Sequence, residues 1–210
     1  SRALLARAQL RLGDMEVLVS MVAVWCWQPR SIYEPYAGGH ADIEVSGHLY
    51  GLTRKRGAAC LDPNETREFR RIYPGHVWAI SPGDLGQQIE LVSSSRSKTP
   101  TTRDLGPPEV VVFGKRVPAE AAADLQEFAF RQVGQPPNYS TVSVDSTMNC
   151  VTFVAWLLGQ AGILPGTFKL TNREYMPNLF QAALETLHAD GHLPFREERV
   201  LQSGAWVLKR

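Results

Sequence analysis

The sequence of 210 residues is poor in cysteine, has nearly balanced charges and contains no long apolar run. Its three cysteines are odd in number and lack the spacing of metal ligands, so we predict neither a disulfide framework nor a zinc site. A formal net charge of +1 provides no electrostatic attraction to nucleic acid or to an anionic membrane. These absences favour an ordinary globular protein without a metal or other cofactor and without a nucleic-acid partner.

The longest apolar run extends from Val17 to Trp27 and contains Ser20. It is too short to cross a bilayer, which takes about 20 residues in a helix. Arginines precede the run as they would in a signal peptide, but bulky Trp25 and Trp27 stand where a cleavage site needs small residues. We therefore expect no signal peptide and no integral membrane segment.

The spacing of apolar residues divides the chain into three consecutive parts. Leucines and alanines at helical spacing predict a leading helix over residues 1–14. Residues 15–166 are predicted to form the main domain. Residues 167–210, with a helix within 171–189 and a hairpin within 199–208, are expected to extend that domain.

The main domain is predicted to contain strands followed by helices. The valine-rich segment from Glu16 to Trp27 is apolar at odd and even positions alike, which is typical of a strand buried on both faces. Further strands are expected over residues 76–80, 88–92 and 109–113. A helix is expected over residues 118–133, which begin with proline and are followed by glycine. We therefore predict an α+β fold in which an antiparallel sheet packs against helices.

A hairpin with a histidine at its start is predicted over residues 40–53. The first arm alternates polar and apolar residues, and Ser-Gly at positions 46 and 47 is typical of a two-residue turn. Such a turn pairs Val45 with His48 and, counting back, His40 with Thr53. His40 and Asp42 then share one face of the strand. A histidine at this position can project from the edge of the sheet toward a cleft.

Asn149 and Cys150 are predicted to open a second helix of the main domain. Asn149 is a good N-cap, which places Cys150 in the first turn. The unpaired N–H groups and the positive end of the helix dipole favour the thiolate there. The backbone N–H of Cys150 is the predicted donor to an oxyanion. The alternative is an inert buried cysteine, since free cysteines are often core residues.

The histidine precedes the cysteine, which reverses the usual order in papain-like enzymes. This order, with the motifs Gly38–Leu52 and Met148–Val154, resembles the circularly permuted papain-fold peptidases of the PPPDE family, which include deSUMOylating and deubiquitinating isopeptidases. The resemblance implies a circularly permuted papain-like (NlpC-like) fold with His40 and Cys150 as the catalytic pair. The NlpC-like cell-wall amidases and the lecithin-retinol acyltransferase-like enzymes share the order, and Val151 departs from an asparagine frequent in the PPPDE family.

We therefore predict a thiol-dependent hydrolase that cleaves an amide or isopeptide bond of a polypeptide or peptide-containing substrate. Cys150 attacks the carbonyl carbon, His40 transfers the proton, and a thioester intermediate forms. The alternatives are a cell-wall peptide amidase acting as a secreted antibacterial effector, an acyltransferase or lipid hydrolase of the same fold, and a non-catalytic binding module. The expected location is the cytoplasm or, after delivery by a secretion system, a target cell. The oligomeric state is left open.

Thr53 and Asp42 are the candidates for a third group that orients His40. Thr53 faces His40 in the predicted register, although a hydroxyl is a weak orienting group. Asp42 lies about 7 Å along the strand from His40, which is long for direct contact. A Cys-His dyad is the remaining alternative. The other histidines, Cys60 and the strand tryptophans are interpreted as structural or surface residues, namely His48, His76, His188, His192, Cys60, Trp25, Trp27 and Trp78.

Overall fold

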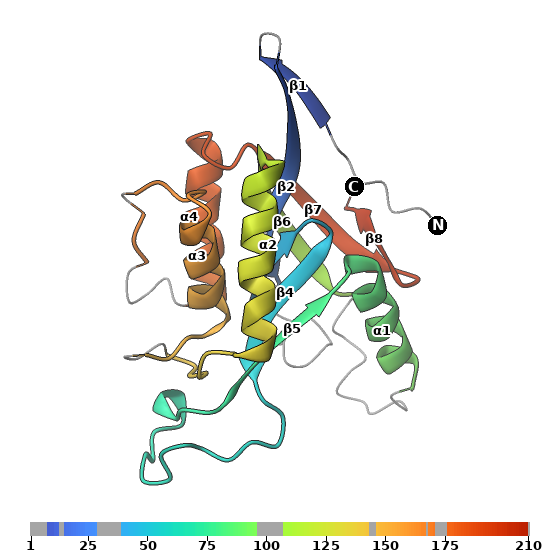
Figure 1. The fold of residues 1–210 in the computed structure, drawn as a ribbon. Helices are drawn as coiled ribbons and strands as arrows, with labels where there is room; N and C mark the ends of the chain where they lie inside the picture. The colour runs from blue at the N-terminus through green and yellow to red at the C-terminus, as the bar shows by residue number, and fades with distance from the viewer. Residues whose placement is uncertain are drawn as a thin grey trace.

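The computed structural model describes residues 8–12, 15–28, 39–95, 107–142, 146–166, 168–170 and 176–209. Within these residues the chain is a mixed α/β structure with one antiparallel sheet (Figure 1). The sheet has eight strands in the order β5-β4-β3-β2-β6-β7-β8, and β1 pairs with β2 beside this path. The strands are β1 (Ala8–Leu12), β2 (Met15–Trp27), β3 (His40–Val45), β4 (His48–Arg54), β5 (Gly75–Ile80), β6 (Glu109–Pro118), β7 (Phe195–Gln202) and β8 (Ala205–Leu208).

Helices cover both faces of this sheet. One face packs against α2 (Ala119–Gly134), α3 (Cys150–Gln160) and α4 (Pro177–Ala189), and the other against α1 (Pro82–Ser95). A short 3-10 helix, η2 (Glu68–Arg70), lies in the long connection between β4 and β5. None of the described helices combines the length and the apolar character needed to cross a bilayer.

The β2 strand is the centre of the sheet, as the sequence predicts. It pairs with β3 on one side and with β6 on the other. Side chains from Val22 to Cys26 alternate between the two apolar clusters, and all are buried. Trp25 and Trp27 point to the α1 face, while Val24 and Cys26 point to the face covered by α3 and α4. This two-sided burial explains why apolar residues occupy consecutive positions.

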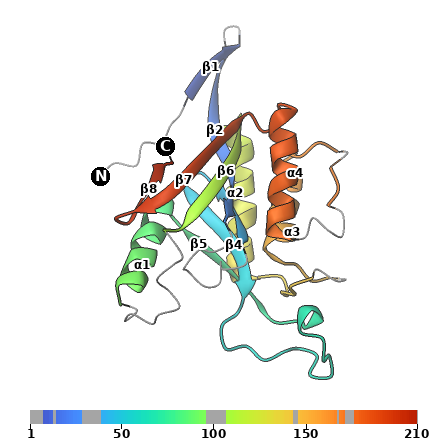
Figure 2. The ribbon, with the colours of Figure 1, turned by 180° about the vertical axis from the view of Figure 1, so that it is seen from behind.

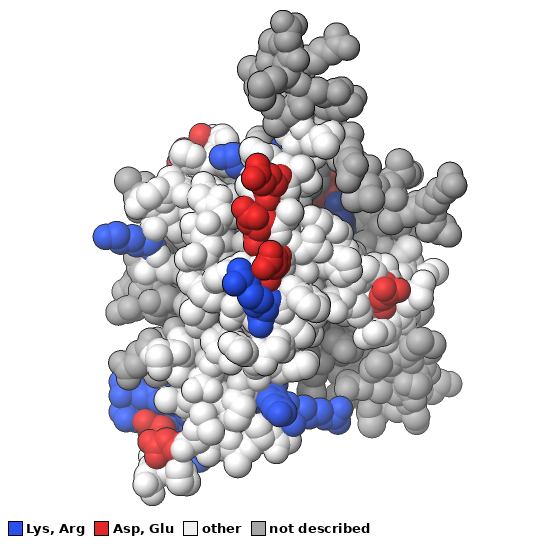
Figure 3. Space-filling model, in the orientation of Figure 1, with Lys and Arg blue, Asp and Glu red and all other residues white. Residues whose placement is uncertain are grey.

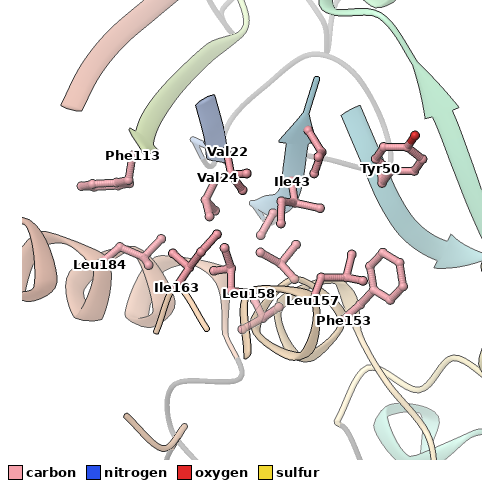
Figure 4. Close-up of a cluster of buried hydrophobic side chains, with 14 of the residues drawn as sticks. Val22, Val24, Ile43, Tyr50, Phe113, Phe153, Leu157, Leu158, Ile163 and Leu184 are labelled. Carbon is pink, nitrogen blue, oxygen red and sulfur yellow. The ribbon is translucent and has the colours of Figure 1, made fainter. Parts of the chain in front are cut away.

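The larger core lies between the sheet and the helices α3 and α4. Figure 4 shows Leu157 and Leu158 of α3 facing Val24 and Ile43 of the sheet, and Phe153 below Tyr50. All these side chains are buried. The amphipathic run that follows Cys150 therefore anchors α3 on β3 and fixes the amino end of this helix relative to the start of β3.

The β3–β4 hairpin forms with the predicted turn. Ser46 and Gly47 have φ values of 51° and 81°, as a turn with two left-handed residues requires, and Val45 pairs with His48. The described β3–β4 ladder runs from this pair to Ile43 and Tyr50. Further along β4, Thr53 pairs with His76 of β5. The expected cross-strand pair of His40 and Thr53 is therefore not part of the ladder.

The carboxyl-terminal segment joins the main sheet. The expected helix within residues 171–189 is described from Pro177 onward as α4, and the expected hairpin forms from β7 and β8. Figure 2 shows β7 beside β6, and the register pairs Phe113 with Arg196. The extension therefore enlarges the sheet of the main domain.

Two expected elements are wrong in type. Residues 8–12 form a strand that pairs with β2, where the sequence predicts a helix. A short helix is marginally stable alone, whereas pairing with β2 satisfies the backbone hydrogen bonds of one strand edge. Residues 88–92 lie in α1, where a strand is expected. The hydroxyl of Ser81 accepts from the backbone N–H of Asp84 at 3.1 Å, which caps this helix.

Charged side chains are spread over the surface. The exposed face of α2 carries Glu120, Asp124, Glu127 and Arg131, and Figure 3 shows a row of acidic side chains with a basic one at its end. Positions four, three and four residues apart lie on one side of a helix, so this row is the solvent-exposed face of α2.

Candidate active site

His40 and Cys150 meet where β3 begins and α3 begins. A side-chain hydrogen bond joins them, although the two residues are 110 positions apart in the sequence. Their exposed fractions are only 5% for His40 and 7% for Cys150. The structure therefore brings together the two reactive groups that the sequence selects, and it leaves little of either side chain exposed.

Asp42 is the third member of this group. Its Oδ1 atom lies 2.8 Å from the Nε2 atom of His40, and its side chain is fully buried. Because Nε2 faces Asp42, Nδ1 is the ring nitrogen that remains for Cys150. The expectation that Asp42 lies too far from His40 is wrong. The two side chains lean toward each other along the strand, so the distance between their polar atoms is much shorter than the distance between their backbone positions.

Trp27 provides a second hydrogen bond to Asp42. Its indole Nε1 donates to Asp42 Oδ2 over 2.6 Å, and Trp27 is the Cα partner of His40 across the β2–β3 ladder. The sequence interpretation of Trp27 as a packing residue is therefore incomplete. The residue types on these strands were a signal for this bond, because a buried indole N–H needs an acceptor and a buried carboxylate needs donors.

Electrostatics in this buried group favour a charged imidazole. Burial alone would lower the pKa of His40, but the Asp42 carboxylate and then Cys150 outweigh it and raise the pKa to about 10. Burial is also the largest cause of the raised pKa of Cys26, followed by the charges of Asp42 and Cys150. The pKa of Tyr139 rises to about 12 through burial and then through the charge of Cys150. A thiolate at Cys150 therefore has its favourable partner in His40.

The amino end of α3 is tightly capped, as the sequence predicts. The side chain of Asn149 accepts from the backbone N–H of Thr152 at 2.9 Å, and the Thr152 hydroxyl accepts from the backbone N–H of Asn149 at 2.9 Å. Asn149 Nδ2 also donates to the carbonyl of Thr141 over 3.0 Å. These bonds fix Cys150, the next residue, in the first turn of α3.

Two segments from other parts of the chain border the site. In the first turn of α4, Pro177 packs against Gly39, the neighbour of His40, while Gln181 accepts a hydrogen bond of 2.8 Å from Gln28. On the other side, the β4–β5 connection pairs with the segment that leads to Cys150, through a bridge between Tyr73 and Tyr139. The carboxyl-terminal extension therefore contributes to the surroundings of the site.

The remaining candidates lie outside this group. Thr53 pairs with His76, whose side chain is exposed, and His48 is exposed at the hairpin turn. The sulfur of Cys60 donates to the carbonyl of Asp62 over 3.0 Å in an exposed loop. Within the part of the chain that the structure describes, no cluster of three or more His, Cys, Asp or Glu side chains has the geometry of a metal site.

This chain was compared with protein families, with curated proteins and with solved structures. No family model and no curated protein matches it. Among solved structures, it is similar to the crystal structure of the type VI secretion system effector TseH. The sequence identity is 15% and the TM-score 0.43, and the match covers 90% of this chain and 98% of the TseH chain. A functional assignment therefore rests on the geometry of the site.

Proposed function

We propose that this chain is a thiol-dependent hydrolase of the circularly permuted papain-like type, with Cys150, His40 and Asp42 as its catalytic triad. One observation carries the proposal: His40 bonds to Cys150 on one side and to Asp42 on the other, and all three side chains are buried. A nucleophile, a base and a group that orients the base are the parts that covalent acyl transfer requires. The order of the elements supports the fold type, because the histidine hairpin precedes the cysteine helix.

The reaction follows from the protonation states of the pair. His40 holds the proton of Cys150, and the thiolate attacks the carbonyl carbon of an amide. The negative charge on the resulting oxyanion is held by the backbone N–H of Cys150, because N–H groups in the first turn of a helix have no intrahelical acceptor. His40 then gives its proton to the leaving amine, and the C–N bond breaks. The products of this half-reaction are a free amine and a thioester on Cys150.

Water completes the cycle. His40, now neutral, takes a proton from a water molecule as the water oxygen attacks the thioester carbonyl. The C–S bond breaks, a carboxylic acid leaves, and the proton returns to the Cys150–His40 pair. The Asp42 carboxylate stabilises the imidazolium at each stage at which it forms.

The class of substrate can be tested with three chemistries. Ubiquitin-like conjugates, peptidoglycan fragments and phospholipid vesicles are incubated with the wild-type chain, with Cys150→Ala and, as a matched control, with Cys60→Ser. We expect turnover of one peptide-containing substrate and a transient acyl mass on the Cys150 peptide. Both signals are absent in Cys150→Ala and present in Cys60→Ser. Turnover that survives Cys150→Ala would overturn the proposal, and turnover of phospholipid alone would replace the amide substrate by an ester.

A further inference from the structure

The two oxygens of the Asp42 carboxylate have different partners. Oδ1 lies 2.8 Å from His40 Nε2, and Oδ2 accepts from Trp27 Nε1 over 2.6 Å. The carboxylate is fully buried, so each oxygen needs a donor within the protein. The Trp27 bond satisfies Oδ2 and also fixes the plane of the carboxylate, because rotation that improves one bond breaks the other.

Gly51 provides the space in which the carboxylate lies. A Cβ atom on Gly51 would overlap Asp42 Oδ1 and would come within 2.6 Å of two ring carbons of Trp78. Gly51 of β4 pairs with Trp78 of β5, and its φ is not in the left-handed region, so the backbone conformation alone does not require glycine. The reason for glycine here is steric, since a neighbouring side chain occupies the position of the missing methyl group.

Trp25 repeats the contacts of Trp27 without reaching the site. Trp25 and Trp27 each pack edge-on against Trp206, with ring centroids 5.3 Å and 5.4 Å from it. Trp25 donates through Nε1 to Glu44 Oε2 over 2.8 Å, as Trp27 does to Asp42. Both indoles are buried on β2. Only the acceptor of Trp27 bonds in turn to His40, so Trp25 is a matched control within the same chain.

We infer that Trp27 and Gly51 are positioning residues that hold the Asp42 carboxylate in the orientation His40 needs, and that they act on Cys150 only through Asp42 and His40. This inference rests on the proposed triad. It adds to the triad a hydrogen-bond donor on β2, Trp27, and a position without a side chain on β4, Gly51. Substitution at either residue should therefore change the reactivity of Cys150 even when no substrate is present.

The test uses the rate of Cys150 alkylation by iodoacetamide, followed by mass spectrometry from pH 5 to pH 10 in the full chain with Cys60→Ser. At neutral pH, Trp27→Phe should lower the rate roughly tenfold, the lower end of the effect expected for one hydrogen bond to a charged group. Trp25→Phe should leave it within about twofold, as a change outside the network should. In the Asp42→Ala background, Trp27→Phe should have no further effect, because its acceptor is gone.

Equal losses in Trp27→Phe and Trp25→Phe would overturn the inference, as would a Trp27→Phe effect that persists in full without Asp42. Either result leaves the proposed function intact, because that proposal fails on a different observation, namely an unchanged Cys150 rate in His40→Ala.

Gly51→Ala is compared with Gly114→Ala, a sheet glycine whose added Cβ would lie 3.0 Å from the Met21 sulfur. Only Gly51→Ala should lower the rate and change its pH profile. If Gly51→Ala does not fold, the comparison of Trp27→Phe with Trp25→Phe tests the inference by itself.

Discussion

The Nε2 atom of His40 lies 2.8 Å from the Oδ1 atom of Asp42, two residues further along the same strand, and both side chains are buried. A buried ion pair is favourable only while both partners are charged, and loss of one charge leaves the other without compensation. The stability of this protein should therefore depend on the protonation of His40.

The first prediction concerns the free energy of unfolding at different pH. The pKa of His40 is raised from 6.5 to about 10, because Asp42 and Cys150 outweigh the opposing effect of burial. A raised pKa gives stability that is complete below pH 6.5 and is lost as the pH rises to about 10. The stability difference between the wild type and Asp42→Asn should thus be largest near pH 6 and smaller near pH 10. Urea unfolding at both pH values measures it, and a difference that grows with pH would contradict the ion pair.

The second prediction concerns the cap of α3. Asn149→Ala removes the bond to Thr152 and the bond to Thr141, and should lower the free energy of unfolding by about 1 to 2 kcal/mol. Asn149→Asp keeps the capping acceptor and loses only the donor to Thr141, so its loss should be smaller. Urea unfolding of the two variants compares them. Equal losses would mean that the Thr141 bond, and not the cap, carries the stability.

The third prediction concerns the carboxyl-terminal hairpin. Trp206 packs against Trp25 and Trp27, and its Nε1 donates to the carbonyl of Pro82 over 3.1 Å. Trp206→Ala should lower the free energy of unfolding by about 3 kcal/mol. This is the lower end of the range for replacing tryptophan by alanine, because Trp206 is partly exposed. Leu208→Ala on the same strand should stay within about 0.5 kcal/mol, since Leu208 is 60% exposed. Thermal and urea unfolding give both values. A loss in Trp206→Ala as small as that in Leu208→Ala would show that the hairpin does not support the sheet.

The fourth prediction concerns the order in which the cysteines react in the native protein. Cys26 is buried, and burial raises the pKa of its thiol above the ordinary value. We expect iodoacetamide to modify Cys150 first, Cys60 more slowly, and Cys26 only after unfolding. Peptide mapping of each site over time measures the order. Early modification of Cys26 in the folded chain would contradict the packing of β2.

Local patterns were enough to predict the two elements that carry the reactive residues. The Ser46–Gly47 turn sets the hairpin register, and the Asn149 cap places Cys150, because both depend on residues close together in sequence. The same kind of signal was present for α1, where Ser81 and Asp84 with an intervening proline form a helix start. There the apolar alternation of residues 88–92 led to the wrong element type.

The partners of Asp42 could not be predicted in the same way. Its contact with His40 depends on how two side chains lean along β3, and its contact with Trp27 depends on the register between β2 and β3. Those strands are joined by a long connection, and its sequence does not fix their register. The strand over residues 8–12 was missed for a related reason, because its stability comes from pairing with β2 and not from its own pattern.

The most direct test of the account is the reaction of Cys150 with iodoacetamide near neutral pH in the wild type and in His40→Ala. If the buried imidazole holds the thiol proton, its removal should slow Cys150 about tenfold or more and leave Cys60 unchanged. An unchanged Cys150 rate in a correctly folded His40→Ala variant would contradict the proposed catalytic pair.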